Sequence, residues 1–262
     1  MADQRVLITG GAGFLAGFVV ETLRMVSAFA IAGFTAYLTL FTGLANRALL
    51  TETYVDPLRE FFGRYKLRVA VLLLLLVGLY RISDIVLGVI SNVFYHDMGF
   101  SKSEIAATVK TFGLFMTILG GFMGGILAVR FGVMRILFVG ALLTVLTNLL
   151  FILLAESGYN LWLLYAVISA DNLTAGLASA AFIAFLSALT NIRFTAIQYA
   201  IFSSLMTLLP KIIGGYSGTM VDAVGYSQFF LIASIMGVPV LLLVWLAGRS
   251  MDIRLPADEI QK

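Results

Sequence analysis

Residues 25–45 read MVSAFAIAGFTAYLTLFTGLA, a run of 21 residues without a charged side chain. A helix needs about 20 predominantly apolar residues to cross the hydrocarbon core of a bilayer. No aspartate or glutamate occurs anywhere between Glu21 and Glu52, so the absence of acidic residues extends beyond the run itself. The run therefore predicts a transmembrane helix, and it sets the fold class to be expected for the rest of the chain.

The preceding stretch LITGGAGFLAG, residues 7–17, has the small-residue spacing of a dinucleotide-binding turn at Gly10, Gly13 and Ala16. That fold needs an acidic residue about 20 positions later to bind the ribose, and the apolar run stands there instead. None of the ten tyrosines is followed four residues later by the lysine that short-chain dehydrogenases require. We therefore reject an enzyme, and we assign these glycines to close helix packing in lipid.

The composition of the whole chain agrees with a membrane protein. Hydrophobic residues make up 61% of the 262 residues and charged residues 12%, whereas soluble domains contain about 25% charged residues. The sequence has no cysteine and one histidine, His96, which excludes disulfides, cysteine-ligated metals and multi-histidine metal sites. We expect neither a metal nor a cofactor.

Eight stretches are long and apolar enough to cross a bilayer, so we predict an all-α polytopic membrane protein. The predicted spans are 6–23, 25–45, 69–94, 105–129, 134–155, 161–189, 197–220 and 227–247. They divide the chain into a two-helix segment (1–46), a linker (47–68), a six-helix bundle (69–247) and a tail (248–262).

The linker, RALLTETYVDPLREFFGRYKLR, is the longest polar connection. Pro57 suits the start of a helix. The apolar stripe of that helix would consist of Leu58, Phe61, Phe62 and Tyr65. We predict an amphipathic helix that lies on the cytoplasmic membrane surface and connects two bundles.

Basic residues in the connections predict the orientation. If the spans alternate, twelve lysines and arginines fall on the side of the N-terminus and two, Arg24 and Lys102, on the other side. This asymmetry predicts that both termini are cytoplasmic. It also explains the pI of about 9.2 by topology and by contact with the anionic lipid bilayer, without a nucleic-acid partner.

Five ionisable residues lie inside the predicted spans, where each costs about 2.5–3.5 kcal/mol at a helix centre. They are Arg81, Asp84, Lys110, Asp171 and Lys211. Arg81 and Asp84 are three residues apart and share a helical face, so they either form a local ion pair without further role or face a wet cavity. Polar residues on the same helix favour the cavity: Tyr80, Ser83, Ser91 and Asn92.

Two further polar segments are candidate parts of the same path. Asp171 is followed by Asn172 and then by small residues at four-residue spacing, which favour close helix contact. The small residues are Gly176, Ala180 and Ala184. Gln198 begins the second segment, which ends in Pro210 and Lys211, and a proline inside a span kinks the helix.

The stretch GGILAVRFGVMR, residues 124–135, resembles the signature of the Major Facilitator Superfamily, a glycine-rich turn with basic residues on the cytoplasmic side. The matching residues are Gly125, Arg130, Gly132 and Arg135. The stretch LYRISDIVLGVISNVFYHDMGFSKSEIA (79–106) resembles the AmpG-type muropeptide permeases, a bacterial group related to the acetyl-CoA transporters. Three more stretches, 170–191, 194–218 and 221–230, share this resemblance.

The resemblance covers about residues 56–247 and, less distinctively, residues 5–45. It implies a partial twelve-helix fold, in which this chain matches two helices of the N-terminal half and a complete C-terminal six-helix half. A missing N-terminal four-helix piece is then an expected partner. In this superfamily helices one, four, seven and ten line the cavity. Arg81 and Asp84 would lie on helix seven, Asp171 and Asn172 on helix ten, and Lys110 and Lys211 on helices eight and eleven.

The function implied is proton-coupled import of anhydro-muropeptides across the bacterial inner membrane. Because muropeptides carry carboxylates, Arg81 and Lys211 are candidates for anion contact, and Asp84 and Asp171 are candidates for proton coupling. The remaining candidate binding residues are Asn92, Lys110, Asn172 and Gln198. The alternatives are a carrier of acetyl-CoA or another anionic solute, and a non-transporting fragment or half of a split permease.

Overall fold

The computed structural model describes residues 27, 30–35, 37 and 51–250. The chain divides into two compact units, residues 1–58 and 59–262. In the first unit, residues 27, 30–35 and 37 are α-helical. The predicted span 6–23, most of the predicted span 25–45 and the tail from residue 251 onward lie outside the described residues.

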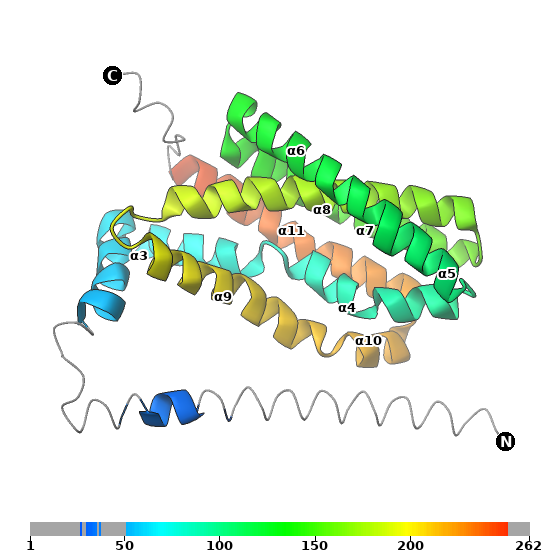
Figure 1. Cartoon of the computed structure of the whole chain (residues 1–262), viewed down its shortest axis with the longest axis horizontal. Helices are drawn as coiled ribbons and strands as arrows, with labels where there is room; N and C mark the ends of the chain where they lie inside the picture. Colours follow the sequence, from blue (N-terminus) through cyan, green and yellow to red (C-terminus); the bar gives the residue numbers. More distant parts are fainter. Residues whose placement is uncertain (1–26, 28–29, 36, 38–50, 251–262) are drawn as a thin grey trace. The chain divides into compact units, whose positions relative to one another are not determined.

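All regular structure within residues 51–250 is helical (Figure 1). The elements are the π-helix η1 (Thr51–Val55), α3 (Asp56–Leu79), α4 (Ile82–Asp97), α5 (Lys102–Ile105), the π-helix η2 (Ala106–Phe112), α6 (Gly113–Phe131), α7 (Val133–Ser157), α8 (Leu161–Leu189), α9 (Thr195–Gly214), α10 (Ser217–Val224) and α11 (Tyr226–Ser250). Six stretches of the described chain are long and apolar enough to cross a membrane, and they coincide with the six spans predicted between residues 69 and 247. The all-α membrane fold is confirmed.

The six long stretches form a closed bundle within the second unit. α6 packs along α8, α8 along α7, α7 along α11, α11 along α4 and α4 along α9, and α9 also contacts α8. Figure 1 shows α6, α8 and α7 on one side of α11, with α4 and α9 on the other. Aromatic rings join three of these helices, because Phe94 of α4 and Phe151 of α7 both pack on Phe230 of α11.

Glycines bring α6 and α8 into direct backbone contact. A Cβ atom on Gly120 would lie 2.0 Å from the carbonyl oxygen of Leu173, and one on Gly176 would lie 2.1 Å from that of Thr117. A Cβ atom on Gly124 would lie 2.5 Å from the carbonyl oxygen of Leu177. Gly176 therefore belongs to a helix contact of the kind predicted, in which it meets the backbone of Thr117 and Gly121, while Gly120 and Gly124 of α6 meet the backbone of Leu173 and Leu177.

We expect Gly120→Ala to lower the free energy of unfolding by about 1–3 kcal/mol, the usual cost of overpacking, because the backbone of α8 cannot yield like a flexible side chain. Thermal melting of the purified protein in detergent measures this. Gly121→Ala is the matched control, since its Cβ would come no closer than 4.0 Å to Gly176 and alanine is the better helix former. Equal melting temperatures for the two variants would contradict the packing argument.

Residues 59–65 of α3 pack on the bundle through part of the predicted apolar stripe, namely Phe61, Phe62 and Tyr65. Phe61 is 2% exposed, and its ring centroid lies 5.3 Å from that of Phe202 on α9. Glu60 accepts hydrogen bonds from the side chains of Asn191 and Gln198, both at 2.8 Å, and from both ends of the Arg64 guanidinium. The segment is thus tied to the turn between α8 and α9.

A kink at Lys66 separates residues 59–65 from the membrane-spanning part of α3. Lys66 has a φ of 54° and a ψ of 151° inside the helix, in a region that L residues rarely adopt. The kink lets residues 59–65 follow the end of the bundle while residues after Lys66 enter the hydrophobic span.

We expect Glu60→Ala to loosen this segment, because it removes the acceptor that three side chains share. Hydrogen–deuterium exchange of residues 59–65 should become faster, corresponding to local opening that is easier by about 1 kcal/mol or more. Glu156→Ala, at an exposed position near the end of α7, is the control and should leave this exchange unchanged. Unchanged exchange in Glu60→Ala would show that the Phe61 contact alone holds the segment.

Candidate functional site

The helix that carries Arg81 and Asp84 is interrupted where these charges lie. α3 ends at Leu79, Tyr80 and Arg81 form a turn, and α4 begins at Ile82. The predicted span 69–94 lies within one membrane-spanning stretch, Thr51–Asp97, and the turn at Tyr80 and Arg81 falls inside it. Neither glycine nor proline occupies the turn itself, so its cause lies in tertiary contacts rather than in local helix propensity.

Arg81 and Asp84 form an ion pair at the start of α4. Arg81 Nε donates to Asp84 Oδ2 at 3.1 Å, and the terminal nitrogen of the same guanidinium contacts the same oxygen. The two side chains are 29% and 25% exposed. Asp84 lies in the first turn of α4, where the helix dipole also favours a negative charge.

Asp171 extends this pair into a three-charge cluster across two helices. It lies on α8, and it interacts electrostatically with Arg81 and Asp84. No hydrogen bond or ion pair to the Asp171 carboxylate occurs within the described part of the chain. Tyr95 of α4 is buried within electrostatic range of Asp171. The structure thus brings together three of the five charges that the sequence places in the membrane.

The other two charges lie elsewhere. Lys110 is on η2 and Lys211 is on α9, and both side chains are exposed. Among the described residues neither lysine forms an ion pair. Pro210, beside Lys211, is buried within α9, whereas the side chain of Lys211 itself is exposed.

The three predicted polar candidates have different surroundings. Asn92 is exposed on α4. Asn172 accepts a hydrogen bond from Thr117 at 3.0 Å and donates to the carbonyl of Ile168, so it links α8 to α6. Gln198 binds Glu60 and the backbone nitrogen of Asn191, at the opposite end of α3 from Arg81. Neither Asn172 nor Gln198 therefore joins the charge cluster.

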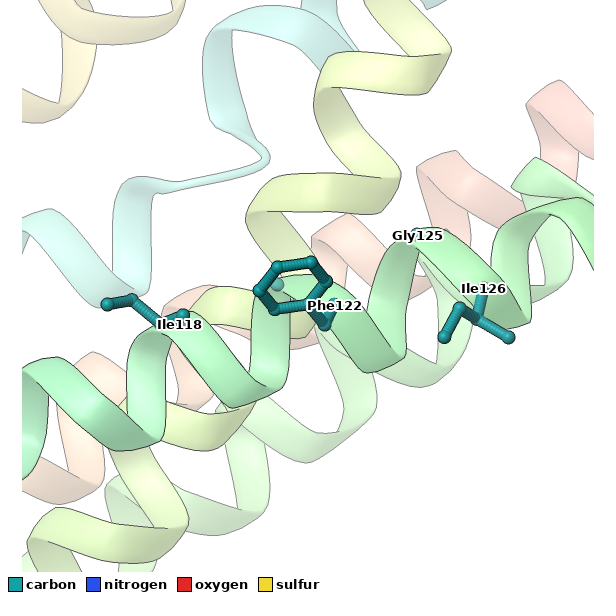
Figure 2. A pocket seen from close by; sticks show the side chains of 5 residues that line it. Ile118, Phe122, Gly125 and Ile126 are labelled. Carbon is teal, nitrogen blue, oxygen red and sulfur yellow. The ribbon is translucent and has the colours of Figure 1, made fainter.

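The four residues that match the superfamily signature lie in different places: three at the α6–α7 connection and one, Gly125, within α6. Gly132 has a φ of 92° and is the single residue between the two helices, a backbone conformation that favours glycine. Arg130 and Arg135 are exposed beside it. Gly125 is not in the turn but on α6, where it lines a shallow apolar groove of about 450 Å³ with Ile118, Gly121, Phe122 and Ile126 (Figure 2).

Two of the polar residues expected to line a cavity with Arg81 bind other helices of the bundle instead. Tyr80 donates to the carbonyl of Leu137 on α7 at 3.0 Å and stacks on Phe182 of α8. Ser83 is 2% exposed and donates to the carbonyl of Ala233 on α11. These bonds hold both sides of the turn against the bundle.

Sequence reasoning missed Tyr95, although a signal was available. Tyr95 follows Asp84 by eleven residues, about three helical turns, which places the two on one face. The signal was weak because tyrosine in a membrane helix usually marks the lipid interface.

A family model of the Major Facilitator Superfamily matches residues 73–261. The chain belongs to this superfamily. The rejection of an enzyme is therefore confirmed, and the resemblance to the AmpG-type group is confirmed by individual relatives.

The chain is 39% identical over 204 residues to an uncharacterized protein of Haemophilus influenzae, with 75% of the chain and 48% of that protein covered. It is 31% identical over 202 residues to a protein named putative transporter AmpG 4 of Rickettsia conorii, covering 77% and 48%. It is 33% identical over 204 residues to the anhydromuropeptide permease of Escherichia coli, covering 78% and 41%. The chain spans about half the length of the curated relatives it matches.

We expect Arg81 and Asp84 to be energetically coupled, because neutralising one partner leaves the other charge unpaired inside the bundle. Arg81→Gln and Asp84→Asn should each lower the melting temperature, and the double variant should lower it by less than the sum. The coupling should be about 0.5–3 kcal/mol, as for other residues in contact. If the effects of the two single variants add up in the double variant, the ion pair contributes nothing measurable to stability.

Proposed function

We propose that the chain is part of a secondary transporter of the bacterial inner membrane that imports a small anionic muropeptide together with protons, and that its C-terminal six-helix bundle supplies solute-binding residues. The observation that carries this proposal is the cluster of Arg81, Asp84 and Asp171, drawn from α4 and α8 inside an apolar bundle. Charges at membrane depth usually belong to a solute or ion path. The name of the Escherichia coli relative supports the solute class.

The cluster suggests how solute and proton binding are linked. Arg81 is the cation that a solute carboxylate would bind, and Asp84 already occupies it. When the solute carboxylate replaces Asp84, that aspartate loses its counter-charge beside Asp171. Two neighbouring carboxylates without a cation favour binding one proton between them. Solute binding at Arg81 therefore promotes proton binding at the aspartates, and the coupling is reciprocal.

The remaining candidates take secondary roles in this proposal. Exposed Lys110, Lys211 and Asn92 attract or orient the anion outside the cluster. Asn172 and Gln198 hold helices in place through the bonds described above. The basic residues of the connections, including Arg130 and Arg135, keep the connections and both termini on the cytoplasmic side.

The test is uptake of labelled anhydro-muropeptide by vesicles from permease-deficient cells, with the chain expressed alone and with a separate four-helix N-terminal piece. We expect Asp171→Asn to abolish uptake driven by a proton gradient while solute exchange at equal pH persists, because Arg81 remains. Asp222→Asn, at an exposed position on α10, is the matched control and should behave as wild type.

Gradient-driven uptake that survives in both Asp84→Asn and Asp171→Asn would overturn the proton-coupling proposal. If unlabelled acetyl-CoA inhibits the uptake and unlabelled muropeptide does not, the solute is an acetyl-CoA-type anion and not a muropeptide. If vesicles take up no muropeptide either with the chain alone or with the chain and the four-helix piece together, the transport proposal is wrong.

A further inference from the structure

A buried hydrogen bond between α7 and α4 reaches the first turn of α4 at Ser83, the residue before Asp84. Asn148 of α7 donates through Nδ2 to Ser83 Oγ, and Ser83 donates its own proton to the carbonyl of Ala233. Asn148 is 1% exposed. Three helices therefore meet at Ser83, which immediately precedes Asp84 and lies two residues after Arg81.

The orientation of the Asn148 amide follows from the single proton of Ser83. A hydroxyl has one proton to donate, and that of Ser83 goes to Ala233, so Ser83 can only accept from Asn148. The Nδ2 group must face Ser83, and Oδ1 must face away. Asn148 Oδ1 is in fact buried without a hydrogen-bond partner.

An unpaired buried oxygen is unfavourable, and it is most unfavourable in a membrane bundle where no water replaces the missing donor. Asn148 is therefore a poor choice for filling the space between α7 and α4, where an apolar side chain would leave nothing unpaired. Its distinctive contribution is the bond to Ser83.

That bond matters because α4 begins without a capping side chain. Arg81 occupies the N-cap position and makes no capping hydrogen bond, so the first turn of α4 lacks the usual local stabilisation. Tyr80 fixes the preceding turn to α7 and α8. The Ser83 bonds are then the tertiary contacts that set the rotation of the turn carrying Asp84.

We propose that Asn148 is a positioning residue for the Arg81–Asp84 pair and acts through Ser83. It touches neither charge. Its contribution to transport rests on the function proposed above, whereas its effect on the ion pair does not.

The matched control is Ser234 of α11, which is 3% exposed and donates to the carbonyl of Val145 at 2.8 Å. This bond also joins α7 to a neighbouring helix at a buried position, but it does not contact α4. Asn148→Ala and Ser234→Ala therefore remove comparable buried bonds, and they differ in whether the first turn of α4 loses a partner.

The experiment repeats the Arg81→Gln and Asp84→Asn melting cycle in three backgrounds: wild type, Asn148→Ala and Ser234→Ala. We expect both background changes to lower the melting temperature. The two charge substitutions should become additive in Asn148→Ala and should remain coupled in Ser234→Ala. Coupling that persists in Asn148→Ala, or that disappears equally in both backgrounds, would overturn the proposal. If Asn148→Ala does not fold, Ser83→Ala removes the bond to Asn148 together with the bond from Ser83 to Ala233 and is expected to give the same additivity.

Transport kinetics provide the second measurement. We expect Asn148→Ala to raise KM about tenfold, which corresponds to about 1.4 kcal/mol of lost coupling, with the maximal rate retained, while Ser234→Ala leaves KM unchanged. Because the melting cycle needs no solute, a failure of the transport proposal leaves the cycle interpretable. If the Arg81–Asp84 coupling disappears in Asn148→Ala but no variant transports muropeptide, the proposed function is wrong and Asn148 still positions the pair.

Discussion

Hydrocarbon offers no hydrogen-bond partner, so polar groups in the bundle interior need partners from the protein itself. The backbone meets most of this requirement by being helical along the membrane-spanning stretches that the structure describes, apart from short turns such as the one at Tyr80 and Arg81. Buried hydroxyl groups meet it by donating to carbonyls of neighbouring helices, as Ser217 does to Val86 and Ser234 to Val145. Each such bond ties two helices together and also fixes their rotation, because the hydroxyl reaches only one carbonyl.

The same constraint shapes the charge cluster. A charged side chain in this setting needs a counter-charge or a wet surface, and Arg81 with Asp84 supplies the first. Asp171 has no hydrogen-bonded or ion-paired cation of its own among the described residues, and it shares the field of Arg81 with Asp84. The interruption between α3 and α4 places the pair at the start of a helix, where the helix dipole favours the negative charge of Asp84. The turn at Tyr80 and Arg81 thus stabilises the negative charge of Asp84 by placing it in the first turn of a helix.

Several features of the bundle follow from residue spacing alone and could be predicted. Six apolar stretches, recognised by their length and lack of charge, predicted the helices to within a few residues at most ends. The depth of Arg81, Asp84 and Asp171 in those stretches singled them out, because charges are costly there whatever they contact. The four-residue spacing after Asp171 identified Gly176 as a contact residue, since small side chains on one face allow two helices to approach.

Other features depend on partners that are distant in the sequence. Ser83 and Asp84 are neighbours and look alike as polar residues of one helix, yet Ser83 turns to Ala233 and Asp84 to Arg81. Asn172 and Gln198 looked like solute contacts, but Thr117 and Glu60 occupy their amides. The sequence by itself determined the membrane fold and the charged positions, because apolar length and desolvation are properties of each segment. Only the tertiary structure decided which polar groups remain free for a solute, because that depends on which side chains from other helices have already bound them.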